Sequence, residues 1–392
     1  MHLTRILELS DLAPGPRGVS AAVSLHAHTS YSREVARDLP VYIEQIPVIA
    51  PLYRRELAAY RGRRGQDVDF SKGWWHPPAS PDQVWRTEVE QIKRLLGLAA
   101  LVSISDHDDI RAPVALARGG TACPISLEWT VPFGPGFFHL GVHNLPASRG
   151  PDIAARLCAF AECPNSEELG NLLDDLNDDR DTLVVLNHPM WDLARVGATR
   201  HAALLRTFLS TYRDRVHAVE FNGYRSREEN VRVCALSEDL GVPVVSGGDR
   251  HGLTANAVVN LTTASSWGGF VREIREWRMS QILILPAYRD HLVARKLAVV
   301  ADVLRPYPAN PAGPRRWIDR VSCEWQGQVR PLAFHWPDGG PVWVRTAVMA
   351  FRALTSPVAV ALLRHTCLRR DTVPLSCEID HALALQVDPV AV

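Results

Sequence analysis

Helical and strand-like patterns alternate along the chain from about residue 81 to about residue 290, and this alternation most restricts the possible fold. The segment SPDQVWRTEVEQIKRLLGL has a capping serine, a proline in the first turn and apolar positions at helical spacing. Short apolar runs such as AALVSIS and TLVVLNH are typical of buried strands. The alternation predicts an α/β fold, with a parallel sheet or barrel covered by helices.

Two regions depart from this alternation. Residues 35–79 form an insertion that contains RRELAAYRGRRG and FSKGWWHPPASP, and we expect a lid or an accessory subdomain there. After about residue 290 the alternation stops, and the proline-rich RPYPANPAGPRRW indicates a linker. Beyond it, RVSCEWQGQVRPLAFHW is strand-like and 341–368 is helical. We therefore predict a barrel over 20–290 and a small C-terminal extension of unassigned role over 291–392.

Composition limits the partners and the compartment. The 392 residues have a formal net charge of zero, which gives no electrostatic footprint for nucleic acid or an anionic membrane. Seven scattered cysteines do not form a disulfide framework. The N-terminus lacks the pattern of a signal peptide, and the most apolar late stretch is interrupted by Arg345, Arg352 and Pro357. We expect a cytoplasmic protein with no membrane partner.

Nearly every predicted strand is followed by a histidine or an acidic residue. In an α/β barrel the carboxyl ends of the strands converge on one mouth, so these side chains should meet there. Imidazole and carboxylate groups are the ligands of zinc, manganese and iron. A single histidine at a strand end is an ordinary polar residue, but the ordered set predicts a metal centre. The set comprises His26, His28, Asp106, His107, Glu128, His139, His188, Asp249 and His251.

The motifs LHAHTSYS, SISDHDD, SLEW, FHLGVH, LNHP and SGGDRHG resemble, in order and rough spacing, those of the PHP family (polymerase and histidinol phosphatase). The resemblance covers about residues 20–34 and 80–280. It implies a distorted (β/α)7 barrel with a trinuclear metal site at the strand ends. It also implies a metal-dependent phosphoesterase, that is, a hydrolase acting on phosphoric ester bonds.

The same resemblance implies which residues hold each metal. One ion would be bound by His26, His28, Glu128 and Asp249, a second by His107 and His251, and a third by His139 and His188 with Glu128 bridging. The family places a further ligand of the second ion five or six residues after the His-x-His pair. Arg33 cannot ligate and Glu34 can, so Glu34 is assigned. The expected cofactors are two or three Zn, Mn or Fe ions, and Asp106 is expected to orient an imidazole.

The expected reaction is attack on phosphorus by a metal-activated hydroxide. Arg250, between Asp249 and His251, is a candidate clamp for the phosphate, with an outward-turned arginine as the alternative. His188 or His251 could protonate the leaving oxygen. The substrate is expected to be a small phosphorylated molecule. Trp74, Trp75 and His76 could contact it or pack the core of the insertion, and both interpretations stay open.

Other functions remain as alternatives. A nuclease of the 3'–5' exonuclease type is possible, although the neutral charge does not favour nucleic acid. An amidohydrolase-like metal hydrolase also begins with His-x-His, but such barrels use a lysine ligand, and Lys72, Lys93 and Lys296 are not at predicted strand ends. A non-enzymatic metal-binding protein is the third alternative. The oligomeric state is left open.

Overall fold

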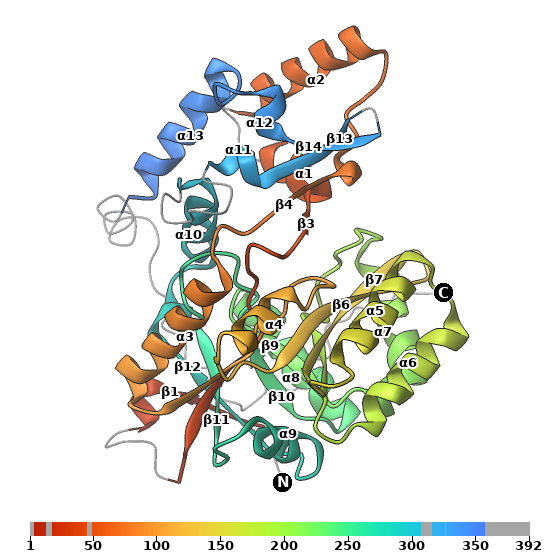
Figure 1. Ribbon diagram of the computed structural model, residues 1–392, viewed down its shortest axis with the longest axis vertical. Helices are drawn as coiled ribbons and strands as arrows, with labels where there is room; N and C mark the ends of the chain where they lie inside the picture. Colours follow the sequence, from red (N-terminus) through yellow and green to blue (C-terminus); the bar gives the residue numbers. More distant parts are fainter. Residues whose placement is uncertain (1–3, 13–17, 45–48, 307–315, 326, 357–392) are drawn as a thin grey trace.

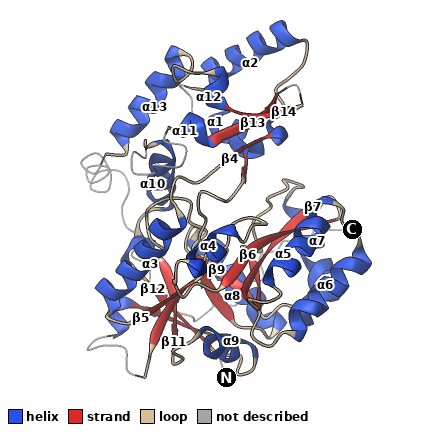
Figure 2. Cartoon of the chain, viewed as in Figure 1, coloured by secondary structure: helices blue, strands red, loops and turns tan. Residues whose placement is uncertain are grey.

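The computed structural model describes residues 4–12, 18–44, 49–306, 316–325 and 327–356, and these form a mixed α/β fold. Its strands lie in two five-stranded sheets and one four-stranded sheet (Figure 2). Helices pack around the two larger sheets in the lower part of Figure 1, and the smaller sheet belongs to a lobe above them. The α/β prediction is confirmed at this level.

The first sheet has the strand order β1-β12-β11-β2-β5. Its outer pairs, β1 with β12 and β2 with β5, are parallel, and β11 runs antiparallel to both of its neighbours. The strands are β1 (Thr4–Glu8), β2 (Ala21–Ser24), β5 (Ala99–Val102), β11 (Val258–Thr262) and β12 (Ser280–Ile284).

The second sheet has the order β10-β9-β8-β7-β6. The strands are β6 (Ile125–Phe133), β7 (Gly136–Leu145), β8 (Leu183–Asn187), β9 (Ala218–Asn222) and β10 (Val244–Gly247). β8, β9 and β10 are parallel, but β7 runs antiparallel to both β6 and β8. The expectation of an all-parallel sheet is therefore wrong at β7. The cause is the turn between Phe133 and Gly136, which folds β6 and β7 into a hairpin.

Strand pairing closes neither sheet into a barrel among the described residues. Isolated bridges nevertheless join residues that follow the strands of one sheet to the other sheet. Ala27, just after β2, bridges Arg250, just after β10. His107, after β5, bridges Glu128 of β6. The two sheets thus meet where the candidate ligands lie.

The third sheet combines the insertion with the C-terminal extension. Its order is β14-β13-β4-β3, and all its pairs are antiparallel. β3 (Glu34–Val35) and β4 (Gly73–Trp75) come from the insertion and its start, whereas β13 (Val321–Trp325) and β14 (Gln328–Pro331) come from the extension. Residues that are far apart in the sequence therefore form one sheet; Figure 1 labels β13 and β14 near α12, and β3 and β4 below α1.

Helices account for most of the remaining described chain. α3 begins with a capping box between Ser80 and Gln83, as its sequence predicts. α5 and α10 were not predicted. The proline-rich linker at 307–315 and the end of the predicted helix beyond residue 356 lie outside the described residues. The helices are α1 (Leu39–Glu44), α2 (Ala50–Arg64), α3 (Pro81–Leu96), α4 (Arg111–Arg118), α5 (Gly150–Glu162), α6 (Ser166–Asp178), α7 (Ala198–Tyr212), α8 (Arg227–Leu240), α9 (Trp267–Arg275), α10 (Leu292–Leu304), α11 (Trp317–Arg320), α12 (Leu332–His335) and α13 (Val342–Leu354), with short 3-10 turns at Leu9–Leu12, Ala36–Asp38, Phe70–Lys72, Arg213–Arg215 and Pro286–Arg289.

The largest apolar cluster lies between the second sheet and helices α5, α6 and α7. Trp129, Phe160 and Phe208 are fully buried there, and the indole of Trp129 donates a hydrogen bond to the carbonyl of Leu157. This packing fixes the strands whose ends carry polar groups. Among the described residues, no helix has both the length and the apolarity that crossing a membrane requires.

Candidate metal centre

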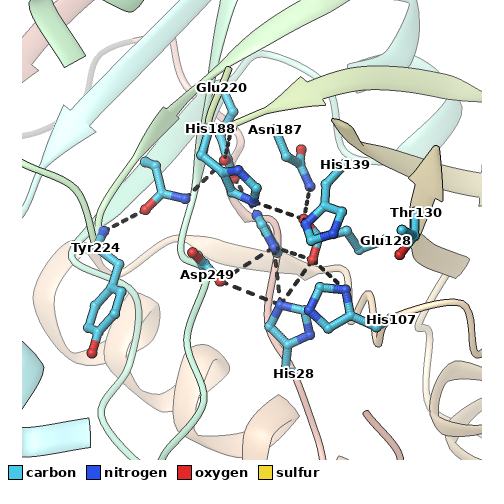
Figure 3. A network of polar contacts seen from close by, with 12 residues as sticks. His28, His107, Glu128, Thr130, His139, Asn187, His188, Glu220, Tyr224 and Asp249 are labelled. Atoms are coloured by element: carbon cyan, nitrogen blue, oxygen red, sulfur yellow. Dashed lines mark hydrogen bonds and ion pairs between the residues drawn. The ribbon is translucent and has the colours of Figure 1, made fainter. Parts of the chain in front are cut away.

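All nine predicted ligands lie in one cluster at the junction of the two larger sheets. His26 and His28 follow β2, His107 follows β5, His188 follows β8, and Asp249 and His251 follow β10. Glu128, His139 and Glu34 lie within β6, β7 and β3. Figure 3 shows the imidazoles pointing toward one another around Glu128. The convergence follows from strand ends that meet at one edge.

Glu128 lies at the middle of the cluster and is fully buried. Its Oε2 is 3.1 Å from His26 Nε2, 3.1 Å from His107 Nδ1 and 3.4 Å from His28 Nε2. Its Oε1 is 3.2 Å from His139 Nδ1 and 3.1 Å from His188 Nε2. One carboxylate thus faces five imidazoles, and the two oxygens face different sets of them.

The donor atoms fall into four overlapping groups in which all atoms lie within 4.8 Å of one another. These groups differ from the ligand sets that the family resemblance implies. His28 lies near Glu34, His107 and His251 as well as near His26 and Asp249. His26 is also grouped with Glu128 and His188. The groups are His28–Glu34–His107–His251, His26–His28–Asp249, His26–Glu128–His188 and His107–Glu128–His139.

The proton on His26 is fixed by Glu220. The Nδ1 of His26 is 2.5 Å from Oε1 of Glu220, and an ionised carboxylate can only accept a hydrogen bond. Nδ1 therefore donates to Glu220, and Nε2 is left to face Glu128 at 3.1 Å and Asp249 Oδ1 at 3.8 Å.

The proton on His28 is fixed in the same way by Ser32. The hydroxyl of Ser32 donates to Glu34 Oε1 at 2.7 Å, so it accepts from His28 Nδ1 at 3.2 Å. The Nε2 of His28 then carries a lone pair, and it lies 3.1 Å from Nε2 of His26. Although burial opposes it, Glu128 and Glu220 raise the pKa of His26 well above its usual value, so a proton can bridge these atoms without a cation. Once that proton is lost, two imidazole nitrogens and two carboxylates face one point, and this donor set fits a metal ion.

Three further atoms support this fit. His107 Nδ1, His139 Nδ1 and Glu128 Oε2 are buried, yet none has a hydrogen-bond partner, since their short contacts lack hydrogen-bond alignment. Buried polar atoms without partners are costly in a folded protein. Bound cations would give these atoms the partners that they lack.

The charges around the buried ligands set the pKa values of these groups. Burial would raise the pKa of Glu128, but the surrounding histidines, led by His26, hold it well below its usual range. Burial and the neighbouring His251 lower the pKa of His28 to about 4, which leaves its imidazole neutral at pH 7. For His107, burial is outweighed by Glu34 and Glu128, which raise its pKa to about 10. Without a metal, protons on such imidazoles balance the carboxylates.

Three of the candidate ligands have an unusual backbone. The φ angles of His26, His188 and Asp249 are 62°, 29° and 46°, in the left-handed region that residues with a Cβ seldom adopt. Each residue lies just after a strand of the two larger sheets. Such strain costs free energy and is concentrated at functional sites in proteins. At these three positions the left-handed backbone directs the side chains into the cluster.

Arg250 does not reach the cluster. Asp249 and His251 point into it, so the residue between them points away. The guanidinium of Arg250 is buried, with Nε 3.1 Å from Glu88 Oε1, and it donates to the carbonyls of Gly252 and Thr254. The expected phosphate clamp is therefore corrected: Arg250 ties its own loop to α3.

Asp106 also has a different role from the one expected. Its carboxylate accepts hydrogen bonds from the backbone N–H and the hydroxyl of Thr29, at 2.5 Å and 2.7 Å. It therefore holds the turn after His28 instead of contacting an imidazole.

The imidazoles are oriented by residues that the sequence did not identify as functional. Glu220 binds His26 Nδ1 and also accepts from the backbone N–H of His188 at 2.8 Å. Asn187 donates to Glu128 at 2.9 Å. Glu220 could have been found, because it is the one charged residue within the apolar strand AVEFN.

Aromatic and cationic groups border the cluster on two sides. The ring of Trp75 lies 5.7 Å from that of His251, and the ring of Trp191 lies 5.3 Å from that of His188. The guanidinium of Arg225 stacks 4.1 Å above the Trp191 ring, and its Nε donates to Glu229. Arg225 is thus a cation held by two contacts beside a candidate ligand.

Comparison with known proteins gives limited similarity. No family model matches the chain, and no curated protein matches it. Among solved structures, PsfC from Pseudomonas syringae is 15% identical with a TM-score of 0.38, covering 54% of this chain and 86% of PsfC. An amidohydrolase from Chromobacterium violaceum is 17% identical with a TM-score of 0.31, covering 45% and 83%.

A third structure, provisionally described as a metal-dependent phosphoesterase from Bifidobacterium adolescentis, is 17% identical with a TM-score of 0.27, covering 45% of this chain and 84% of that one. TM-scores this low do not by themselves assign an activity. The chemistry of the site must therefore be inferred from the geometry of its donor atoms.

Proposed function

We propose that the chain is a metal-dependent phosphoesterase of the PHP type that hydrolyses a phosphate ester of a small molecule. The observation that carries the proposal is Glu128, one buried carboxylate shared by overlapping donor groups whose lone pairs face common points. Sharing a carboxylate favours ions held next to each other. Adjacent ions suit phosphate esters, because they can meet charge on both the attacking and the leaving oxygen.

The proposal includes a distorted barrel of seven strands. The bridge between Ala27 and Arg250 and the bridge between His107 and Glu128 support it. With these two bridges counted as joints, the order β2-β5-β6-β7-β8-β9-β10 returns to β2. Closure by short bridges instead of full ladders would account for the distortion.

We propose three cation positions. The first would be held by His26, His28 and Asp249. The second would be held by Glu34, His107 and His251, and the third by His139 and His188, with Glu128 facing all three. Imidazole-rich sets of this kind suit Zn, Mn or Fe. Bound ions would lower the pKa of water from 15.7 to about 7 and polarise the phosphoryl group.

The chain's own residues would bind the ester and move its protons. Arg225, stacked on Trp191, is proposed to contact the phosphate in place of Arg250. His188 or His251 would give a proton to the leaving oxygen only in a centre where that imidazole is not committed to a cation. His251 Nδ1 lies 2.9 Å from the carbonyl of Asp249, which orients the ring. Glu220 would keep His26 in the tautomer that presents Nε2.

A small substrate is proposed over nucleic acid, because the net charge is zero and a nucleic-acid surface needs an excess of cations. No membrane partner is proposed, and a cytoplasmic location remains part of the proposal.

The test combines a metal count with a substrate panel. Protein purified without chelator would be analysed by elemental mass spectrometry and assayed with p-nitrophenyl phosphate, a bis-ester, nucleotides, sugar phosphates and a single-stranded oligonucleotide. We expect two or three ions per chain and phosphate release that is lost in His188→Ala. Fewer than two ions, or no cleavage after loading with Mn, Zn or Fe, would refute the proposal and direct the search to amide and ester substrates.

A further inference from the structure

The candidate ligand Glu34 belongs to the upper lobe and not to the two larger sheets. We define the accessory lobe as the described parts of 34–75 and 317–354, which contain the four-stranded sheet. Glu34 is the first residue of β3, and its backbone pairs with Trp75 of β4. Trp75 in turn pairs with Val321 of β13. A candidate ligand is thus two strands away from the C-terminal extension.

The lobe reaches the cluster with a carboxylate and an aromatic ring. Glu34 is 8% exposed, and its Oε2 lies 3.2 Å from His107 Nε2 and 3.1 Å from His251 Nε2. The ring of Trp75 lies beside the ring of His251. Both contacts are made by paired residues of neighbouring strands, so they move together with the lobe.

The strands that carry these contacts are too short to hold their position alone. β3 has two residues and β4 has three, and isolated pairs of this length are not stable in water. β13 has five residues and pairs with β4 on one side and β14 on the other. The backbone N–H of His76, which follows β4, also donates to the carbonyl of Arg320, which precedes β13, at 2.9 Å. The extension therefore holds β4, and β4 holds β3.

The extension is itself fixed to the rest of the molecule. The guanidinium of Arg320 is buried and donates to the carbonyls of Val303 and Arg305, near the end of α10. Asp302 of α10 accepts from the backbone N–H of Leu253, two residues after His251. The lobe is thus connected to the cluster both through Glu34 and through α10.

We propose that β13 positions Glu34, so that docking of the accessory lobe and binding of a cation by Glu34, His107 and His251 favour each other. This inference rests on the proposed metal centre, and it adds that cation binding at one position depends on the C-terminal extension. If lobe docking raises the affinity of this site, then filling the site must stabilise lobe docking by the same factor. The other cation positions use no residue of the lobe and should not depend on it.

The first experiment compares ion binding in three variants of the full chain. Ser322→Pro removes the backbone N–H of the β13 residue that pairs with Trp74 of β4, and Glu34→Gln removes the ligand. Val342→Pro is the matched control, since it is an exposed first residue of α13 where proline is tolerated. We expect the weakest-bound Zn²⁺ to dissociate with a Kd at least tenfold higher in the first two variants, and with an unchanged Kd in the control.

The second experiment measures the reverse direction and does not require β13 to be altered. Trypsin cleavage within α2, at its exposed Arg61, Arg63 and Arg64, reports opening of the lobe. Zn²⁺ should slow this cleavage at least tenfold in the wild type and by less than twofold in Glu34→Gln. Equal protection in both proteins would overturn the proposal, even if Ser322→Pro does not fold.

The outcomes separate this inference from the proposed function. A wild-type chain that binds no ions would refute the metal centre itself. A wild-type chain that binds its full set, together with a folded Ser322→Pro variant of unchanged affinity, would refute only the role of β13. Circular dichroism and the thermal midpoint of each variant establish that it is folded.

Discussion

At the scale of single residues, the centre depends on which nitrogen of each imidazole carries a proton. The sequence predicted most of these residues from their places at strand ends and Glu34 from the spacing of the family that it resembles, and the structure places all of them within one cluster. It could not predict the partners that fix the tautomers, because Glu220 and Ser32 act through contacts across the fold. It also allowed two directions for Arg250, and only packing against Glu88 decides between them.

Glu220→Gln should weaken cation binding without removing a ligand. The amide can donate as well as accept, so it no longer fixes the proton on His26 Nδ1. Removing a partner of this kind costs about 10–100-fold in metal affinity. A chelator competition with Zn²⁺ would measure the change, and Glu228→Gln, an exposed acid on α8, is the control. An unchanged affinity in Glu220→Gln would show that the tautomer does not matter.

Arg225→Gln should raise the KM for a phosphate ester by about tenfold or more, since one hydrogen bond to a charged group contributes roughly 1.5–3 kcal/mol. Steady-state kinetics on the best substrate of the panel would measure this. Arg232→Gln removes the same charge from an exposed position on α8, the helix that begins two residues after Arg225, and should leave KM within about twofold. Equal effects of the two substitutions would mean that KM depends only on the net charge of the protein and not on the position of Arg225.

At the scale of elements, local patterns identified some helices and strands and missed others, even long ones such as α2. α3 was predicted from its capping signals, and β8 from its apolar run. The direction of β7 and the existence of α5 and α10 were not predicted. The reason is that strand direction is decided by the turn and by partners across the sheet, which a local pattern does not contain.

Gly247→Ala should destabilise β10 and displace Glu220. An added Cβ would lie 1.6 Å from Glu220 Oε1, a distance that forces the carboxylate to move. Overpacking of this kind costs about 1–3 kcal/mol. Urea unfolding would measure the loss. Gly170→Ala in α6 meets no atom within 4 Å and should be stabilising by about 0.5–1 kcal/mol. A neutral Gly247→Ala would show that Glu220 has room to shift.

His217, which precedes β9 and contacts Val184 of β8, should make the free energy of unfolding depend on pH. Its Nδ1 accepts from the backbone N–H of Val184, and burial, assisted by Arg275, lowers its pKa to about 3. The unfolded chain, with a pKa near 6.5, takes up this proton first as pH falls. The free energy of unfolding therefore falls below pH 6.5, by up to about 1.4 kcal/mol per pH unit.

Urea titrations at pH 7 and pH 5 would test this, with His217→Asn as the comparison, since its side-chain oxygen can still accept from Val184. The wild type should lose about 1–2 kcal/mol more than the variant between the two pH values. Parallel losses in the two proteins would assign the pH dependence to other groups.

At the scale of the whole molecule, the decisive feature is an association of segments that no local pattern predicts. The insertion and the extension were expected to be separate features, yet β4 and β13 pair across about 250 residues of sequence. Register between such strands is set by their docking onto the rest of the fold. Sequence reasoning could therefore identify Glu34 as a ligand from its spacing without showing which part of the molecule holds it.

Removing cations should lower the stability of the entire chain, because an ion that binds only the folded state stabilises that state. One site filled at a thousand times its Kd contributes about 4 kcal/mol. We expect chelation to lower the thermal midpoint by at least about 5 °C, and Zn²⁺ or Mn²⁺ to restore it. Mg²⁺ prefers oxygen ligands and should not restore it. Equal recovery with Mg²⁺ would mean that positive charge alone relieves the cluster, so imidazole coordination would no longer be required to explain it.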